Sequence, residues 1–305
     1  MQGAQALVHF FNLRRAQPFV TERAEVYLSR TGNFPPQNVA QSPDLLQRRF
    51  VIDLHSHILH GLDDGAKSLD ESLRMLRVAK RCGTTDIVAT PHANGRFVFD
   101  PDLVEQRIEE LRRMSVDEAG IRVHAGCDFH LQFDNIEDAV AHPRKYTINH
   151  QRYLLVEFPD FGVLHGADQI LFKLIDADMV PIITHPERNA HLQGRFDDLA
   201  TWIQDGCCVQ VTAGSFLGSF GRRAASSARE LLERGLTHFV SSDAHDTVKR
   251  SPDLREAYEH LEAHYGEETV KPLFIDNPAA ALAGHALDFE PVPASMKTRK
   301  WYRFW

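Results

Sequence analysis

From Phe50 onward the chain alternates short β-branched or apolar runs with longer amphipathic segments, and this alternation constrains the fold more than any other feature. Repeated strand–helix units imply parallel strands. Because no Gly-rich dinucleotide-binding fingerprint is present, seven such units favour a closed or nearly closed α/β barrel, with an open doubly wound sheet as the alternative. The predicted strands are Val51–His55, Asp86–Thr90, Ile121–Gly126, Tyr153–Glu157, Pro181–Thr184, Cys208–Val211 and His238–Ser241.

The helices of these units carry recognisable start and stop signals. Ser68-Leu-Asp-Glu71 is a capping box, so the first helix should run from there to about Cys82 and end at Gly83. Gly206 and Gly235 are further C-terminal stops. The remaining predicted helices are Asp102–Val116, Gln169–Asp178, Phe196–Asp205, Ala224–Arg234 and Pro252–His264.

The two ends of the chain do not share this pattern. Residues 1–49 lack a sustained period, and Gly32-Asn-Phe-Pro-Pro36 interrupts any helix there, so we expect an N-terminal extension of low order. A single catalytic domain is expected over residues 50–284. Residues 285–305 form a C-terminal tail whose end, Met296–Trp305, mixes cations and aromatic rings. We expect a flexible or surface-packed end, with docking on anionic lipid or a partner as the alternative.

Composition narrows the class of protein. The 305 residues are 43% hydrophobic and 25% charged with a net charge of −8, which is typical of a globular protein and argues against nucleic-acid binding. No apolar stretch approaches the roughly 20 residues of a transmembrane helix, and no secretory signal precedes the domain. Because the 4 cysteines have no C-x-x-C spacing, we expect a reduced, cytoplasmic compartment.

Metal-ligand side chains follow the predicted strands. The first strand ends in Asp53-Leu-His55-Ser-His57, and residues two apart in a strand point the same way, so both imidazoles can reach one ion. At the carboxyl ends of barrel strands such groups converge. Together with the strand ends named below, these imidazoles and carboxylates outnumber the four ligands of one tetrahedral zinc, which predicts two or three ions. Mixed nitrogen and oxygen donors suit manganese, iron or zinc. The other strand ends supply His92, Asp128, Glu157, His185, Asp243 and His245.

The loops after the strands hold further candidates. In Gly61-Leu-Asp-Asp64-Gly65 we interpret Asp63 as a turn residue and Asp64 as a ligand if the loop folds back over the histidine pair. Arg188 and Arg250 follow metal-ligand candidates, and a guanidinium matches a pair of phosphate oxygens; surface salt bridges are the alternative.

Other polar residues are given structural roles. Glu157 is interpreted mainly as a residue that holds the loop backbone. The histidines without a ligand pattern are expected to be ordinary satisfied or solvated side chains: His124, His130, His142, His150 and His165.

With these residues in place, the chain from about Ile52 to Leu282 resembles the PHP (polymerase and histidinol phosphatase) superfamily, and within it the bacterial manganese-dependent protein-tyrosine phosphatases of capsule and exopolysaccharide gene clusters. The stretches that carry the resemblance are Asp53-Leu-His-Ser-His-Ile-Leu59, Gly61-Leu-Asp-Asp-Gly-Ala-Lys67, Ile87-Val-Ala-Thr-Pro-His92, Val156-Glu-Phe-Pro159, Thr184-His-Pro-Glu-Arg188, Gln210-Val-Thr-Ala-Gly-Ser-Phe-Leu-Gly218, Ser241-Ser-Asp-Ala-His245 and Asp276-Asn-Pro278.

The resemblance implies a distorted seven-stranded (β/α) barrel with a trinuclear site. Manganese is the implied metal, with iron, zinc or magnesium as alternatives. Arg188 and Arg250 would hold the phosphate, and with Asp64 they would be the catalytic residues. The family pattern has Glu where this chain has Asp128, whose side chain is one methylene shorter. The implied ligands are His55, His57, Asp64, His92, Asp128, His185, Asp243 and His245.

The implied reaction is hydrolysis of a phosphomonoester by hydroxide formed from metal-bound water. Cysteine phosphatases have Arg six positions after the nucleophile, and none of the four cysteines here does, which excludes that mechanism. The expected substrate is a phosphotyrosine protein, such as a tyrosine autokinase of polysaccharide export. A small-molecule phosphatase of the histidinol-phosphate type is the alternative; an amidohydrolase or a metal-binding protein without turnover fits the residues less well.

Overall fold

The computed structural model describes residues 50–114, 120–163, 166–288 and 291. The predicted N-terminal extension and most of the predicted tail lie outside the described residues.

The described residues contain nine strands in two parallel sheets, with orders β1-β2-β4 and β3-β5-β6-β7-β8-β9. All neighbouring strands run parallel, as the strand–helix alternation predicts. The strands are β1 (Val51–Ser56), β2 (Thr84–Ala89), β3 (His92–Ala93), β4 (Arg122–Ala125), β5 (Asp128–His130), β6 (Tyr153–Glu157), β7 (Val180–Thr184), β8 (Cys208–Thr212) and β9 (Phe239–Ser241).

The strand count corrects the expectation of seven strands in one closed barrel, which is not confirmed. The predicted strand Asp86–Thr90 stops at Ala89 and the chain resumes as β3, because Pro91 has no N–H to donate to a ladder. The predicted strand Ile121–Gly126 corresponds to β4 alone, and β5 is an additional strand that begins after its predicted end. At Gly126 a Cβ would lie 2.7 Å from Val88 Cγ1, so the chain passes too close to β2 for any side chain.

Backbone contacts join the two sheets at the carboxyl ends of their strands. Ser56, the last residue of β1, bridges to Ala244 after β9, and the His57 N–H donates to the Ala244 carbonyl at 2.8 Å. Where β2 passes into β3, the Asp128 N–H donates to the Pro91 carbonyl at 3.1 Å. The strand ends that carry the candidate ligands are therefore neighbours in space.

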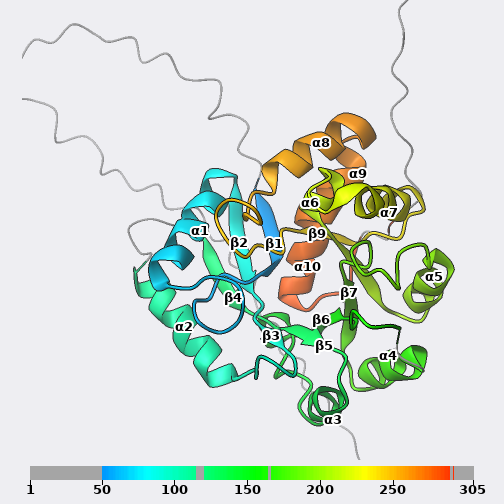
Figure 1. Ribbon diagram of the computed structural model, residues 1–305, viewed down its shortest axis with the longest axis horizontal. Helices are drawn as coiled ribbons and strands as arrows, with labels where there is room; N and C mark the ends of the chain where they lie inside the picture. Colours follow the sequence, from blue (N-terminus) through cyan, green and yellow to red (C-terminus); the bar gives the residue numbers. More distant parts are fainter. Residues whose placement is uncertain (1–49, 115–119, 164–165, 289–290, 292–305) are drawn as a thin grey trace, which may run out of the picture. The chain divides into compact units, whose positions relative to one another are not determined.

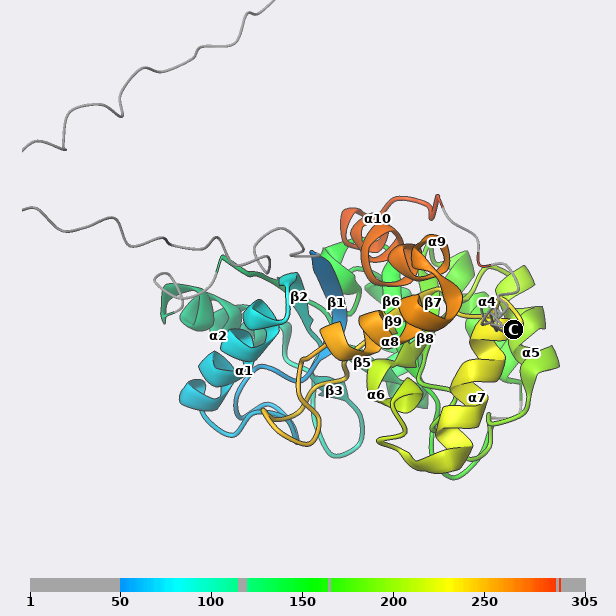
Figure 2. The same ribbon diagram turned by 90° about the horizontal axis from the view of Figure 1, so that it is seen from above.

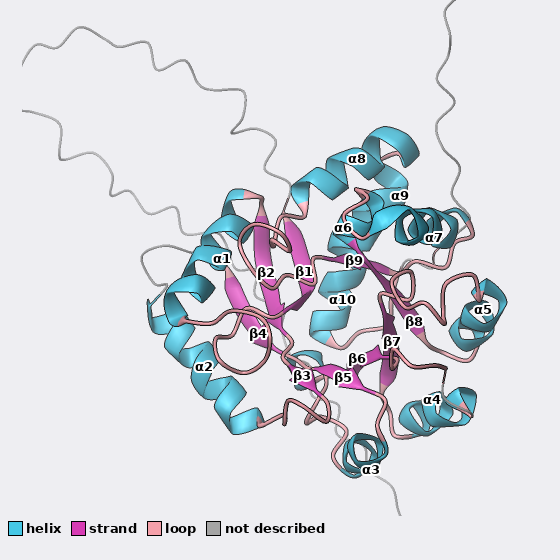
Figure 3. Cartoon of the chain, viewed as in Figure 1, coloured by secondary structure: helices cyan, strands magenta, loops and turns pink. Residues whose placement is uncertain are grey.

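Helices surround the sheets on their outer side (Figure 3). Ser68 caps the first helix, and its Oγ accepts from the Glu71 N–H at 3.3 Å, which confirms the predicted start. No helix in the described ranges is long and apolar enough to cross a membrane. Of the longer helices, α3 and α10 were not predicted. The helices are α1 (Leu69–Arg81), α2 (Pro101–Met114), α3 (Phe133–Ala141), α4 (Ala167–Asp176), α5 (Phe196–Gln204), α6 (Ala213–Phe216), α7 (Gly221–Glu233), α8 (Arg255–Tyr265), α9 (Glu267–Lys271) and α10 (Asn277–Ala283), with short helical turns at Ile148–His150 and Pro272–Asp276.

An inner core lies between the sheets and α10. Leu54 and Phe239 from the strands are fully buried together with Ala281 and Leu282 of α10. In Figure 1 α10 lies between the two sheets, and in Figure 2 it lies at one end of the strands, opposite the loops that follow β1, β3 and β9. Helix α10 thus closes one end with apolar contacts, which leaves the carboxyl ends of the strands for polar side chains.

We predict that His238 makes stability depend on pH. Burial lowers the pKa of this imidazole from 6.5 to about 4, and its Nδ1 accepts from the Val209 N–H at 3.2 Å. The unfolded chain takes up the proton first as pH falls, so the contribution is complete above about pH 6.5 and is lost toward about pH 4. His238→Asn keeps an acceptor that does not titrate. Between about pH 7.5 and about pH 5.5, metal-free wild type should lose about 1 kcal/mol more unfolding free energy than His238→Asn in urea titrations.

Equal losses in the two proteins would show that His238 does not titrate differently in the folded and unfolded states. Because both proteins share every other histidine, the difference between them isolates this one group.

Candidate metal centre

The first element of the site is the end of β1. His55 is the fifth residue of this strand and His57 follows its last residue, and both side chains are buried. Their Nε2 atoms lie 3.3 Å apart, as expected for residues two apart that point to one face. The strand end brings both imidazoles to one point.

Asp243 reaches the same point from the segment after β9. Its Oδ1 lies 3.4 Å from His55 Nε2 and 3.3 Å from His57 Nε2. Burial alone disfavours the charged carboxylate, but the histidines together with Arg188 and Arg250 hold the pKa of Asp243 well below its usual range. Asp243 is therefore a buried anion.

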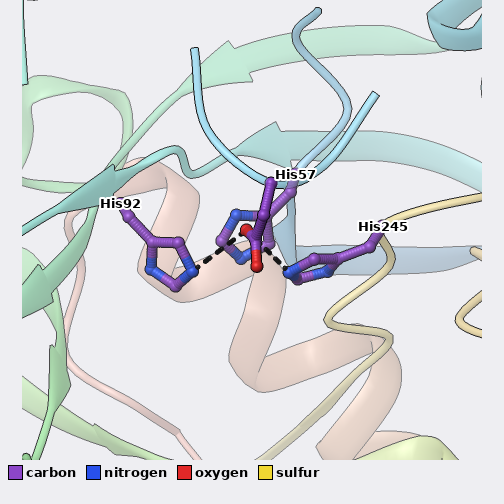
Figure 4. Close-up of side chains that lie close together, drawn as sticks. His57, His92 and His245 are labelled. Atoms are coloured by element: carbon purple, nitrogen blue, oxygen red, sulfur yellow. Dashed lines mark ion pairs between the residues drawn. The ribbon is translucent and has the colours of Figure 1, made fainter. Parts of the chain in front are cut away.

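The loop after β1 folds back over the histidine pair. At Gly65 a Cβ would lie 2.1 Å from the His57 carbonyl oxygen, so this approach requires glycine. Asp64 Oδ1 then lies 3.4 Å from His92 Nε2 and 3.4 Å from His245 Nε2. Figure 4 shows His57, His92 and His245 directed toward one another, with dashed lines for the ion pairs of His92 and His245.

Asp128 and His185 complete the predicted set on the side of β5 and β7. Asp128 Oδ2 lies 3.6 Å from His55 Nε2 and 2.9 Å from His92 Nδ1. His185 packs beside His55 with ring centroids 5.6 Å apart, and burial followed by the nearby Arg188 charge lowers its pKa well below the usual value. The structure therefore brings together all eight ligand candidates that the sequence suggested.

Two further side chains lie in this cluster although the sequence assigned them other roles. Glu157 Oε1 is 3.7 Å from His185 Nε2, and its Oε2 is 3.6 Å from His92 Nδ1 and pairs with His130 Nε2. His130, expected to be an ordinary satisfied or solvated histidine, is partnered as expected but lies inside the cluster, against Glu157 and His92. The signal was present in Asp128-Phe-His130, which has the same spacing of donors as His55-Ser-His57.

Two buried acceptors orient the histidine rings. Asp63 Oδ2 lies 2.6 Å from His57 Nδ1 and accepts from the His92 N–H at 3.1 Å. Gln210 Oε1 lies 3.0 Å from His55 Nδ1. A partner on Nδ1 favours the tautomer that leaves Nε2 unprotonated toward the cluster. Asp63 is thus more than a turn residue, and Gln210, inside a buried strand, had no sequence signal.

Backbone strain marks two of the strand ends. His185 has a φ of 33° and Asp243 a φ of 50°, both in the left-handed region that non-glycine residues rarely adopt. Such strain persists where the surroundings fix a side chain and is concentrated at functional sites.

The charges of the cluster fit divalent cations. Oδ1 of the fully buried Asp128 lacks a hydrogen-bond partner among the described residues, and its Oδ2 faces the nitrogens of His55 and His92. Four overlapping groups of three or four His, Asp and Glu side chains each have donor atoms within 4.8 Å of one another. Without a cation, protons balance the carboxylates: against the cost of burial, Asp63 raises the pKa of His57 to about 9, and Asp128 and Asp64 raise that of His92 to about 11. Mixed imidazole and carboxylate donors are those of manganese, iron and zinc sites.

The two arginines border the cluster instead of forming surface salt bridges. Arg188 and Arg250 both donate to Asp243 Oδ2, the oxygen turned away from the histidines. Arg188 also lies over the ring of Phe220, 4.2 Å from its centroid, which restricts the guanidinium plane. Two guanidinium groups are therefore held at the edge of the candidate metal site.

The cysteines have no part in this arrangement. All four lie in the described part of the chain, are buried and form no disulfide. Cys127 precedes Asp128, and burial raises the pKa of its thiol well above the usual value. A buried neutral thiol is a poor nucleophile, in agreement with the sequence spacing.

Comparisons with known proteins point in one direction. A family model described as capsular polysaccharide synthesis, CpsB/CapC, matches residues 51–283. Tyrosine-protein phosphatase YwqE of Bacillus subtilis (strain 168) is 32% identical over 256 residues, 83% of this chain and 100% of that protein. Tyrosine-protein phosphatase CpsB of Streptococcus pneumoniae is 31% identical over 235 residues, 75% of this chain and 96% of that protein.

A solved structure agrees with the sequence relatives. It is one of the crystal structures of YwqE from Bacillus subtilis and CpsB from Streptococcus pneumoniae, which are described as unique metal-dependent tyrosine phosphatases. It superposes with a TM-score of 0.73 at 32% identity and covers 81% of this chain and 100% of that one. The α/β fold with parallel sheets is therefore shared with that structure.

We predict that Asp63→Asn weakens metal binding without unfolding the chain. The change keeps the size of the side chain but removes the negative charge beside His57 Nδ1, and loss of such a supporting partner lowers metal affinity about 10–100-fold. Mn²⁺ affinity measured by competition with a chelator checks this. Asp70→Asn is the matched control because Asp70 is an exposed partner of Arg74 on α1. Equal affinities of the two variants would contradict a supporting role for Asp63.

Proposed function

The chain belongs to the CpsB/CapC family of capsular polysaccharide synthesis, and from this premise we propose that it is a metal-dependent protein-tyrosine phosphatase. The single observation that carries the proposal is the convergence of buried imidazoles and carboxylates beside two arginines. Phosphoryl transfer requires positive charge around the phosphate, which bound metal ions and the two arginines would supply. We also infer that the two sheets together correspond to the distorted barrel of the PHP superfamily, with the catalytic domain spanning residues 50–284.

The proposed cofactor is two or three divalent ions, with Mn²⁺ favoured. Bound there, the ions would lower the pKa of a coordinated water and neutralise charge on the phosphoryl group. The fit rests on donor chemistry: Oδ1 of the fully buried Asp128 has no hydrogen-bond partner in the described ranges, and imidazole nitrogens surround its Oδ2. The proposed ligands are His55, His57, Asp64, His92, Asp128, His185, Asp243 and His245.

The chain's own charged groups would bind and orient the substrate. Asp243 Oδ2 holds the Arg188 and Arg250 guanidinium groups together, so both can donate to the same phosphate. The Asp64 side chain, 46% exposed, is the most open carboxylate of the cluster and would lie beside the bound phosphate. The leaving phenolate has a pKa of about 10, so it needs less protonation than a serine alkoxide.

The proposed partner is a phosphotyrosine protein of polysaccharide export, such as a tyrosine autokinase. The description of the family as capsular polysaccharide synthesis and the tyrosine phosphatase relatives support this choice. A cytoplasmic location is proposed because the four buried cysteines form no disulfide.

We predict that purified protein with Mn²⁺ hydrolyses a phosphotyrosine peptide faster than phosphoserine peptide or histidinol phosphate. A chelator should abolish this turnover and added Mn²⁺ should restore it, since the metal supplies the nucleophile. A thiol alkylator should leave the rate unchanged because the cysteines are buried. Phosphate release and metal content are measured on the same sample.

Turnover that resists the chelator and stops with the alkylator would overturn the metal-dependent mechanism. Preference for histidinol phosphate would instead retain the mechanism and move the substrate to the small-molecule class.

We predict that Arg188→Ala lowers kcat/KM for phosphotyrosine peptide about 10–100-fold, because one charge-assisted contact to phosphate contributes about 1.5–3 kcal/mol. Inhibition by inorganic phosphate should weaken in parallel. Arg195→Ala is the matched control, since Arg195 is exposed on the protein surface and pairs with Asp198. Similar kinetics for the two variants would rule out phosphate binding by Arg188.

A further inference from the structure

We propose that His130 is a direct metal ligand, which shares one ion with Asp128 and Glu157. The inference adds a ligand to the set proposed above and rests on the proposed metal-dependent function. It comes from the geometry of β5 and its two neighbouring strands.

Strand register sets the positions of these side chains. Asp128 and His130 are the first and last residues of β5, two positions apart, so both side chains point to one face. Across the ladders, His92 of β3 is the register partner of Asp128, and Glu157 of β6 is the register partner of His130. Paired residues of parallel strands lie side by side on the same face. Four possible ligands are therefore held next to one another by backbone hydrogen bonds alone.

The spacing of the donor atoms suits a common ion. His92 Nδ1 lies 2.9 Å from Asp128 Oδ2 and 3.3 Å from His130 Nε2. It lies 3.6 Å from Glu157 Oε2, which pairs with His130. The donor atoms of Asp128, His130 and Glu157, together with one of His92, all lie within 4.8 Å of one another. Ligands about 2.1 Å from a tetrahedral ion are roughly 3.4 Å apart, so one ion can reach this group. His92 Nε2 faces Asp64 on the other side of the ring, so His92 can serve the neighbouring donors instead. The proposed ligands of this ion are therefore Asp128, His130 and Glu157.

A purely structural role explains His130 less well. Its Nε2 faces Glu157, His92 Nδ1 at 3.3 Å and Asn94 Nδ2 at 3.3 Å. One ring nitrogen has either one proton or one lone pair, so it can satisfy only one of these neighbours. A cation between His130, Asp128 and Glu157 would take the His130 lone pair and an oxygen of each carboxylate at once. It would also give a partner to Asp128 Oδ1, which accepts no hydrogen bond within the described ranges.

The short side chain at position 128 explains why a further ligand would be needed beside it. Asp reaches one methylene less far from the strand than Glu, so Asp128 would approach a bound ion less closely than Glu would. The His130 imidazole lies two residues further along the same strand face and is directed to the same side of the sheet. We infer that His130 supplies the ligand that Asp128 is too short to supply alone, so lengthening residue 128 should make His130 dispensable.

The test compares four variants of the full chain with wild type: His130→Ala, His130→Gln, Asp128→Glu and the double variant Asp128→Glu/His130→Ala. His142→Ala is the matched control, because His142 is an exposed histidine at the end of α3 that pairs with Asp138. Metal per chain is measured by mass spectrometry after dialysis against a weak chelator. Proton NMR of the Co²⁺-loaded proteins counts the shifted N–H resonances of ligand imidazoles. Circular dichroism confirms folding, and His130→Gln fills the volume if the alanine variant does not fold.

Loss of His130 is expected to lower the affinity for one ion by at least about tenfold, since even a supporting partner is worth that much. His130→Ala and His130→Gln should each lose one imidazole resonance. The double variant Asp128→Glu/His130→Ala should regain most of the lost metal affinity. His142→Ala should match wild type in both measurements.

Two results would overturn the assignment of His130. One is metal content and spectra of His130→Ala and His130→Gln that equal those of wild type. The other is weakened binding with every imidazole resonance retained, which would make His130 a positioning residue. A wild-type protein that binds no metal would remove the proposed function and this inference together, so the two failures are distinguishable.

Discussion

Buried negative charge that must be balanced is the constraint on which this site depends. Asp128 and Asp243 are almost wholly inaccessible to solvent, and burial of an unpaired carboxylate costs several kcal/mol. Protons on His57 and His92, the guanidinium groups and divalent cations are the available sources of positive charge. The same need for cations makes the site suitable for a phosphate ester, whose reaction develops negative charge.

The frame meets this constraint by separating the two ends of its strands. At one end α10 packs Ala281 and Leu282 against the inner core. At the other end, backbone bonds such as that from the His57 N–H to the Ala244 carbonyl hold the strand ends of the two sheets next to each other. Ligands can therefore be polar and strained, as at His185 and Asp243, because apolar packing elsewhere stabilises the fold.

Two supporting residues determine the orientation of the histidine rings in the cluster. Asp63 and Gln210 contact the Nδ1 atoms of His57 and His55, which turns the Nε2 atoms to the cluster. Arg188 and Arg250 share one oxygen of Asp243, while the other oxygen faces the histidines. The histidine cluster and the two arginines thus meet at a single carboxylate in one connected network.

Local patterns in the sequence determined the strand–helix alternation, the capped start of α1 and the candidate donors at strand ends, because these depend on residues close together along the chain. Only the tertiary structure decided the division into two sheets at Pro91 and Gly126, and the places of Asp63, His130 and Gln210. These depend on register and on the path of loops between strands far apart in the chain. The spacing Asp128-Phe-His130 places two donors on one strand face, but which residues face them is set by which backbone atoms pair once the whole chain has folded.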